Sequence, residues 1–196
     1  MSERPPGTRS RIQEVALELF TEQGYEATSL REIAERLGVT KAALYYHFKT
    51  KEDIVASFME DRVAALDEIV AWGREQPRTD ATRREVLHRY AELLARSNSH
   101  RVMRFLERNQ TALRGHPRSE RIRDIMFLVI DLLSDRGDPL PVRLKSTLAI
   151  FAMHATWFID PDPTAYTDEE RSKSALQIAL ELLDSAHAER ADPASR

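Results

Sequence analysis

Apolar residues recur along this chain at intervals of three and four positions, which is the spacing of one face of an α-helix. The first stripe of this kind consists of Ile12, Val15, Ala16, Leu19 and Phe20. The helix that carries it is predicted to end near Gly24. Every strongly periodic segment repeats in this way, and the alternation typical of β-strands is missing. The pattern therefore predicts an all-α protein.

Two short helices are predicted next, and residues with local roles mark their ends. Ser29 and Glu32 have the spacing of a capping box, which opens a helix by satisfying free backbone N–H groups. Gly38 is predicted to end that helix, because glycine accepts backbone angles that a side chain disfavours. Thr40 is the predicted N-cap of a third helix, which reaches about Phe48.

Glycine and proline divide the rest of the chain into further helices. These cover about Lys51–Arg74, Thr82–Asn98, His100–Leu113, Ser119–Arg136, Leu140–Ile159 and Thr167–His187. The prediction is thus nine helices with flexible tails at residues 1–7 and 189–196. We expect two domains, a three-helix domain over residues 8–50 and a larger helical domain over residues 51–188.

Composition fits a globular protein and excludes several classes of site. The chain has 196 residues, of which 42% are hydrophobic and 31% charged, so it can bury a core without disulfides or metals. It contains no cysteine, which excludes disulfides, thiolate metal sites and cysteine nucleophiles. No apolar run reaches the roughly 18–20 residues that cross a bilayer. Because residues 1–7 also lack the features of a secretory signal, we expect a cytoplasmic protein.

Charge gives no indication of a nucleic-acid partner. The whole chain has a net charge of −3, and the first 51 residues carry eight basic and seven acidic side chains, a net of +1. A basic surface can nevertheless be local, so this balance does not exclude DNA.

The short helices between Thr28 and Lys51 have the arrangement of a DNA-binding helix-turn-helix. Leu44 and Phe48 are four residues apart on the second of them, so both are expected to face a core. Lys41, Tyr45 and Tyr46 would then face outward. A surface that enters the major groove explains them, through contacts to thymine methyl groups and to phosphates.

Residues 8–54 resemble the N-terminal domain of the TetR family of bacterial repressors. The resemblance is carried by Ile33-Ala-x-x-Leu-Gly-Val39, Leu44-Tyr-x-His-Phe48 and Lys51-x-x-Ile54, and it covers about a quarter of the chain. It implies a two-domain, nine-helix regulator whose C-terminal domain binds a small effector and forms a homodimer. It implies neither enzymatic activity nor a cofactor.

The resemblance also implies which residues bind DNA. They are Thr28, Arg31, Thr40, Lys41, Ala43, Tyr45, Tyr46, His47 and Lys51. Arg31, Lys41 and Ala43 would face base edges, and the phosphate contacts would come from Thr40, Tyr45, Tyr46, His47 and Lys51. Because Ala42 and Ala43 lack hydrogen-bonding groups, base recognition is expected to rely on Arg31, Lys41 and thymine methyl contacts. For His47, a structural role at the helix end stays open.

The last two predicted helices carry stripes of mixed large and small apolar residues, which suit helix packing between subunits. The predicted dimer interface consists of Leu148, Ala152, Ala155, Leu176, Ala179, Leu180 and Leu183. A palindromic operator needs two recognition helices roughly 34–36 Å apart, which favours a dimer. The alternative is that these stripes face the protein's own core.

Polar or flexible side chains within apolar stripes indicate an effector site in the C-terminal domain. The predicted lining consists of His88, Met103, Phe105, Asn109, Met126, Phe151, His154 and Trp157. Together these side chains suit a flat, largely apolar ligand. For each one separately, an ordinary core or surface role remains the alternative.

The sequence therefore predicts a regulator, most simply a repressor that binds a palindromic operator as a homodimer and is released by a small apolar ligand. A diiron carboxylate enzyme is the alternative, since Glu85-x-x-His88 has the spacing used in such helical bundles. That site needs a second motif, and the nearest is Asp184-x-x-His187. We accordingly expect no enzyme, no metal and no membrane partner.

Overall fold

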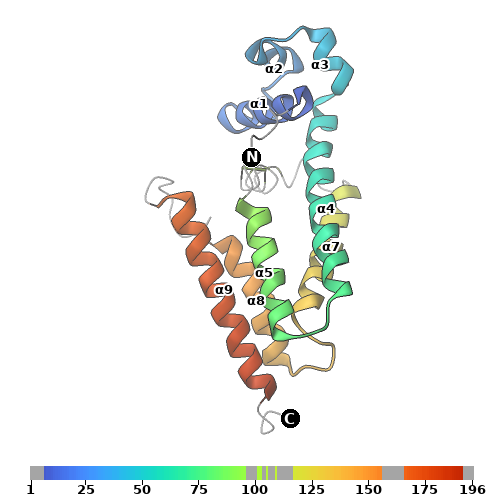
Figure 1. The fold of residues 1–196 in the computed structure, drawn as a ribbon. Coiled ribbons are helices and arrows are strands. Elements are labelled where there is room, and N and C mark those ends of the chain that lie inside the picture. The colour runs from blue at the N-terminus through green and yellow to red at the C-terminus, as the bar shows by residue number, and fades with distance from the viewer. Residues whose placement is uncertain are drawn as a thin grey trace. The chain divides into compact units, whose positions relative to one another are not determined.

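The computed structural model describes residues 7–95, 101, 102, 105, 109, 117–155 and 166–191. Over these residues the chain forms eight α-helices and no β-strand, so the all-α prediction is confirmed (Figure 1). The predicted helix at His100–Leu113 lies mostly outside the described residues, although Arg101, Val102 and Phe105 are helical. The described helices are therefore one fewer than the nine predicted.

The helices begin and end close to the glycines, prolines and capping residues of the sequence. They are α1 (Thr8–Glu22), α2 (Leu30–Leu37), α3 (Lys41–His47), α4 (Lys51–Glu75), α5 (Asp80–Ala95), α7 (Pro117–Leu133), α8 (Leu140–Ala155) and α9 (Asp168–Ala191). Helix α9 continues past its predicted end at His187. None of the described helices combines the length and the low charge that crossing a bilayer requires.

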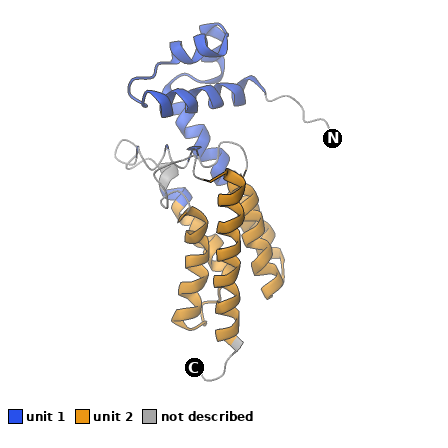
Figure 2. Cartoon of the chain, turned by 90° about the vertical axis from the view of Figure 1, so that its left-hand side faces the viewer, with its two compact units in different colours: residues 1–63, 97–122 blue, residues 64–96, 123–196 orange. Residues whose placement is uncertain are grey.

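The chain divides into two compact units (Figure 2). Unit 1 comprises residues 1–63 and 97–122, and unit 2 comprises residues 64–96 and 123–196. The predicted DNA-binding segment, residues 8–50, lies in unit 1 together with the first part of α4. Each unit has its own cluster of buried apolar side chains.

An aromatic cluster lies in the core of unit 1, and one of its rings comes from far along the chain. Phe105 stacks on Phe20 with ring centroids 5.3 Å apart, and its centroid is 5.9 Å from that of Tyr25. Phe105 is buried, and Val102 packs against the same core. Phe105 was predicted to line an effector site. The structure instead places it in the core of unit 1, because aromatic side chains of α1 and of the turn after it surround it.

In unit 2, the second part of α4 packs with α5, α7, α8 and α9 around a core that includes the fully buried Tyr90. Ala179 and Leu183 of α9 are also fully buried in this core. They were predicted to lie in a dimer interface, but their side chains are covered within their own unit. The small side chain of Ala179 fits where α9 packs against its neighbours.

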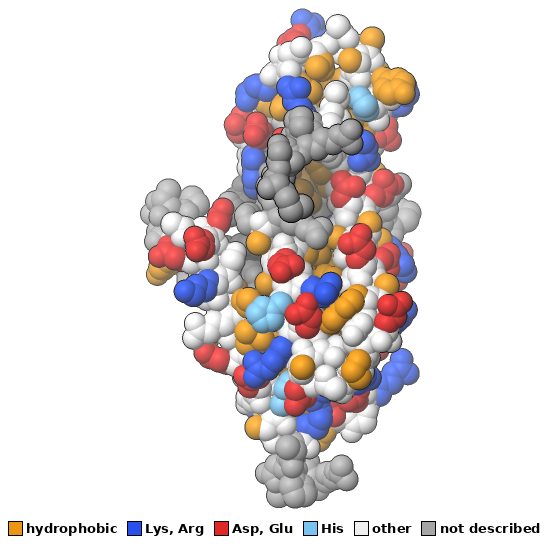
Figure 3. Space-filling model, in the orientation of Figure 1, with side chains coloured by type: hydrophobic (Ala, Val, Ile, Leu, Met, Phe, Trp, Pro, Cys, Tyr) orange, Lys and Arg blue, Asp and Glu red, His pale blue; other side chains and the backbone are white. Residues whose placement is uncertain are grey.

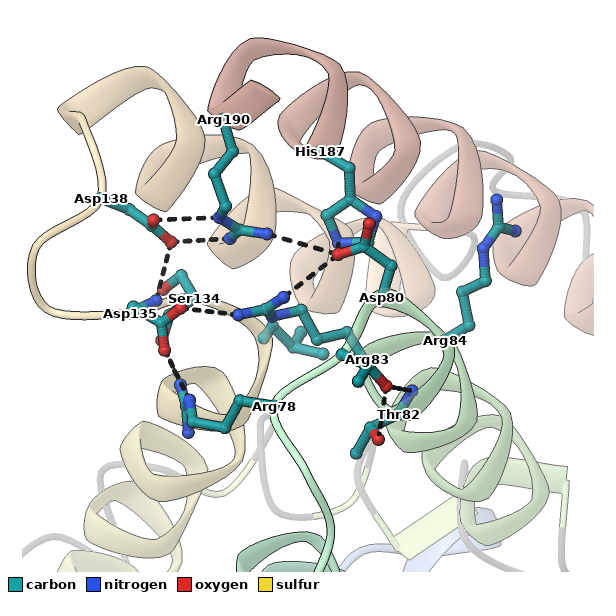
Figure 4. A network of polar contacts seen from close by, with 12 residues as sticks. Arg78, Asp80, Thr82, Arg83, Arg84, Ser134, Asp135, Asp138, His187 and Arg190 are labelled. Atoms are coloured by element: carbon teal, nitrogen blue, oxygen red, sulfur yellow. Dashed lines mark hydrogen bonds and ion pairs between the residues drawn. The ribbon is translucent and has the colours of Figure 1, made fainter. Parts of the chain in front are cut away.

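A network of charged side chains joins the α4–α5 turn, the α7–α8 turn and the end of α9 (Figure 4). The buried Arg83 donates from Nη2 to Asp135 Oδ2 at 2.7 Å, and Arg190 donates from Nη2 to Asp138 Oδ2 at 2.6 Å. The hydrogen bonds from Arg190 lower the pKa of Asp138 below its usual range. The network thus fastens the two turns to α9.

Candidate DNA-binding surface

Helix α2 begins with the predicted capping box. Ser29 Oγ accepts a hydrogen bond from the backbone N–H of Glu32 at 3.2 Å, and the Glu32 carboxylate accepts from the backbone N–H of Ser29 at 2.7 Å. At the other end of the helix, Gly38 has a φ of +73°. In this left-handed conformation a side chain would be strained, which explains why glycine stands at the turn.

Helix α3 has one buried and one exposed face, as the sequence predicts. Thr40 caps the helix, since its Oγ1 accepts from the backbone N–H of Ala43 at 3.1 Å. Leu44 and Phe48 are buried in the core of unit 1, whereas Tyr46 is 81% exposed and Tyr45 43% exposed. A large exposed tyrosine on so short a helix is available to a partner.

The other predicted DNA-binding residues differ in how accessible they are. Arg31 and Lys41 are exposed, Ala43, His47 and Lys51 are half-buried, and Thr28 is only 2% exposed. His47 packs edge-on against Tyr46, with ring centroids 5.2 Å apart. On the face drawn in Figure 3, acidic and basic side chains are interspersed over the described residues, which agrees with the near-neutral charge of the sequence.

Lys51 and Thr28 hold the α1–α2 turn in place. The Lys51 ammonium donates to the backbone carbonyls of Tyr25 at 2.7 Å and Glu26 at 3.3 Å, and it lies 4.6 Å from the centroid of the Tyr25 ring. The Thr28 hydroxyl donates to the carbonyl of Gly24 at 2.8 Å. To donate to a phosphate, the Thr28 hydroxyl would have to give up this bond, whereas the Lys51 ammonium has a third N–H donor. The resemblance implied DNA contacts for both, and sequence reasoning missed this structural role.

Tyr25 completes the anchoring of this turn. Its hydroxyl donates to Glu52 Oε1 at 2.9 Å, next to Lys51 at the start of α4. Burial, reinforced by Glu52, raises the pKa of Tyr25 above its usual value. The pKa of Glu52 is lowered, mainly by a bond to its own backbone N–H. At neutral pH the pair is therefore a neutral phenol bound to a carboxylate.

Residues 12–58 match the model of the family described as bacterial regulatory proteins, tetR family. The chain therefore carries the N-terminal domain of the TetR family. It is 51% identical over 53 residues to the transcriptional regulator AcrR of Shigella flexneri, covering 27% of this chain and 25% of AcrR. It is 36% identical over 77 residues to the repressor KstR2 of Rhodococcus jostii, covering 37% of this chain and 38% of KstR2. Each match thus spans less than half of the relative.

Solved structures extend the fold comparison to most of the chain. A TetR/AcrR-family regulator from Thermobifida fusca covers 90% of this chain and 96% of its own, at 28% identity and a TM-score of 0.54. The alignment with KstR2 of Mycobacterium tuberculosis covers 93% of this chain and 96% of KstR2, at 18% identity and a TM-score of 0.64. AibR was solved with isovaleryl coenzyme A and operator DNA. Its alignment covers 87% of this chain and 96% of AibR, at 23% identity and a TM-score of 0.58. The two-domain helical fold is therefore that of known TetR-family structures.

In unit 2, two of the predicted effector-site residues meet at Tyr90. Its hydroxyl lies 2.7 Å from His154 Nε2 and 3.6 Å from the sulfur of Met126. By contrast, His88 and Phe151 are exposed, so neither lines an enclosed site. Asn109 donates from Nδ2 to the carbonyl of Phe105 at 2.8 Å, within unit 1. Met103 and Trp157 lie outside the described residues.

An exposed apolar stripe runs along α8. It consists of Leu140, Leu144, Leu148 and Phe151, and Ile178 of α9 is also exposed. Of the predicted interface residues, Leu148 and Ala155 are exposed, whereas Ala152, Leu176 and Leu180 are half-buried. Leu140, Leu144 and Ile178 are also exposed but were not among the predicted interface residues. Leu140 and Leu144 are spaced four residues apart, as on one face of a helix. However, α8 has two apolar faces, and the sequence pattern does not show which of them packs against the core.

Three of the four motif residues of the diiron alternative contact other charged side chains, and the fourth is exposed. Glu85 pairs with Arg89 at 3.0 Å, and His88 is exposed on α5. Asp184 pairs with Arg84, and His187 lies 3.4 Å from Asp80. The described residues include no cluster of three or more potential metal ligands. This arrangement gives no support to that alternative.

Proposed function

We propose that this TetR-family chain is a cytoplasmic transcriptional repressor that binds a palindromic operator as a homodimer and releases it when a small ligand binds. The observation that carries the proposal is that helix α3 has one buried and one exposed face. Leu44 and Phe48 hold it on the core, and Tyr45 and Tyr46 face solvent beside Lys41. A helix presented in this way after a tight turn fits the major groove of DNA.

In this proposal, α3 combines contacts to phosphates with apolar contacts to bases. Tyr45, Tyr46 and the capped start of the helix at Thr40 would bind the DNA backbone. Lys41 and Arg31 would donate hydrogen bonds to base edges. Ala42 and Ala43 can offer only their methyl groups, which suits thymine.

The exposed stripe on α8 supports the homodimer. Leu144, Leu148 and Phe151 form a continuous apolar face that burial against a second copy would stabilise. A homodimer would carry two copies of α3, one for each half of a palindrome.

A ligand site around Tyr90, His154 and Met126 would combine one hydrogen-bonding pair with an adaptable apolar wall. We propose a small, largely apolar ligand for it. The structural relative AibR was solved with both a coenzyme A thioester and operator DNA, which supports a ligand-responsive regulator in general terms. Release from DNA requires that the ligand bind the two states with different affinity.

Fluorescence anisotropy with DNA fragments from the region upstream of the gene tests the central proposal. Wild-type protein should bind one fragment tightly, and Tyr46→Ala should weaken binding by about tenfold on all sequences. Lys41→Ala should instead change the preferred sequence. Tyr166→Ala is the matched control, because it removes an exposed tyrosine of unit 2. Equal losses for the Tyr46 and Tyr166 variants would refute the assignment of α3.

A further inference from the structure

Helix α2 carries an exposed ion pair, Arg31–Glu35, in which the proposed mode of DNA binding gives a role to Arg31 alone. Arg31 Nε lies 2.6 Å from Glu35 Oε1, one helical turn further on. Both side chains are exposed, so the pair contributes little to folding stability. An acidic side chain beside a DNA-contacting arginine is also unfavourable near phosphates. A role in orienting Arg31 would explain why an acidic side chain stands here although it adds little stability and is unfavourable near phosphates.

The geometry of the pair determines which part of Arg31 is available to a partner. The guanidinium group carries five N–H donors in a rigid plane. Glu35 accepts the hydrogen bond from Nε, which is the donor nearest the side-chain stem. The two terminal amino groups then form the outer edge of the plane. That edge has the donor pair that matches O6 and N7 of guanine.

We propose that Glu35 is a positioning residue that orients Arg31 to recognise a guanine in each half-site. This inference rests on the proposed DNA-binding function. It adds guanine as the recognised base and Glu35 as a residue that acts through Arg31. Without the carboxylate, Arg31 rotates more freely and can bind any nearby phosphate. Glu35 thereby raises discrimination between sequences and lowers affinity for nonspecific DNA.

Selection of operators from a randomised pool, followed by anisotropy on the best site, tests this inference. Wild-type protein should prefer guanine at one position by about five- to 150-fold. Glu35→Ala should reduce that preference at least about threefold and strengthen binding to nonspecific DNA, with little change in thermal stability. Glu35→Gln keeps an acceptor oxygen for Nε and should retain part of the preference.

Two further variants distinguish the orientation of Arg31 by Glu35 from the general effect of removing a negative charge. In an Arg31→Ala background the guanine preference should be absent, and Glu35→Ala should change it no further. Glu22→Ala removes another exposed acid of unit 1, one that lies 3.5 Å from Arg36, and should leave the preference unchanged. An unchanged guanine preference in Glu35→Ala would overturn the inference, as would a loss of preference that persists without Arg31. If the wild type bound no DNA, the proposed function itself would fail, which is a different result.

Discussion

Lys51 has a structural role in addition to the DNA contact proposed for it. Its ammonium group binds two carbonyls of the α1–α2 turn and lies against the Tyr25 ring. The turn in question contains Gly24, which has a φ of +96°. Lys51 therefore ties the α1–α2 turn to the start of α4, both in unit 1.

We predict that Lys51→Met lowers the stability of the protein even without DNA. The substitution keeps an apolar stem but removes the two hydrogen bonds, at a cost of about 1 kcal/mol. Thermal unfolding measures this effect, and anisotropy should also show weaker binding to all DNA sequences. Lys49→Met is the control, since the Lys49 ammonium donates to the carbonyl of Tyr45, four residues earlier on α3, and not to the α1–α2 turn. If both variants unfold at the wild-type temperature, the anchoring role is wrong.

The anchoring role of Lys51 could not be predicted from the sequence, for a physical reason. Its acceptors are backbone carbonyls, the first of them 26 residues earlier, and every residue type has such a carbonyl. The same holds for the Thr28 hydroxyl, which finds its acceptor at Gly24. By contrast, the exposure of Tyr46 could be predicted, because it follows from the positions of Leu44 and Phe48 on a single helix.

At the scale of elements, the helix ends of unit 1 were predictable because their determinants are local. The Ser29–Glu32 capping box, Gly38 and the Thr40 cap each act within four residues. Helix α8 differs, because apolar side chains cover both its buried and its exposed face. Only packing against the other helices of unit 2 decides that Val142 and Ile150 face inward while Leu144 and Phe151 face outward.

The ion pairs at the end of α9 make a testable contribution to stability. We predict that Arg190→Gln destabilises the protein by about 1–3 kcal/mol, because the Asp138 carboxylate loses its charged donor while its side chain remains only 8% exposed. Chemical denaturation at neutral pH measures this difference.

The pH dependence follows from the lowered pKa of Asp138. In the unfolded chain this carboxyl group protonates near pH 4, whereas in the folded protein it stays charged to lower pH. The stabilisation by Arg190 is therefore present above about pH 4 and is lost as the pH falls further. Wild type and Arg190→Gln should consequently converge in stability on acidification. A constant difference down to pH 2 would contradict this account of the pair.

At the scale of the whole molecule, the α8 stripe makes a prediction about assembly. Phe151→Glu should convert a dimer into a monomer, because it places a charge within the apolar face proposed to be buried. Analytical ultracentrifugation measures the change. Phe127→Glu on α7 is a matched control, since Phe127 is 61% exposed and Phe151 60% exposed. A monomeric wild type, or dissociation caused equally by both variants, would refute the proposed interface.

The stacking of Phe105 on Phe20 has a consequence for protein engineering. Hybrid regulators are made by joining the DNA-reading part of one protein to the sensing part of another, and the helix-turn-helix suggests a junction soon after residue 50. Such a junction would leave Phe20 and Tyr25 without the ring that covers them. A hybrid that keeps residues 101–109 of this chain, or supplies an equivalent aromatic ring, should fold where the simple fusion does not.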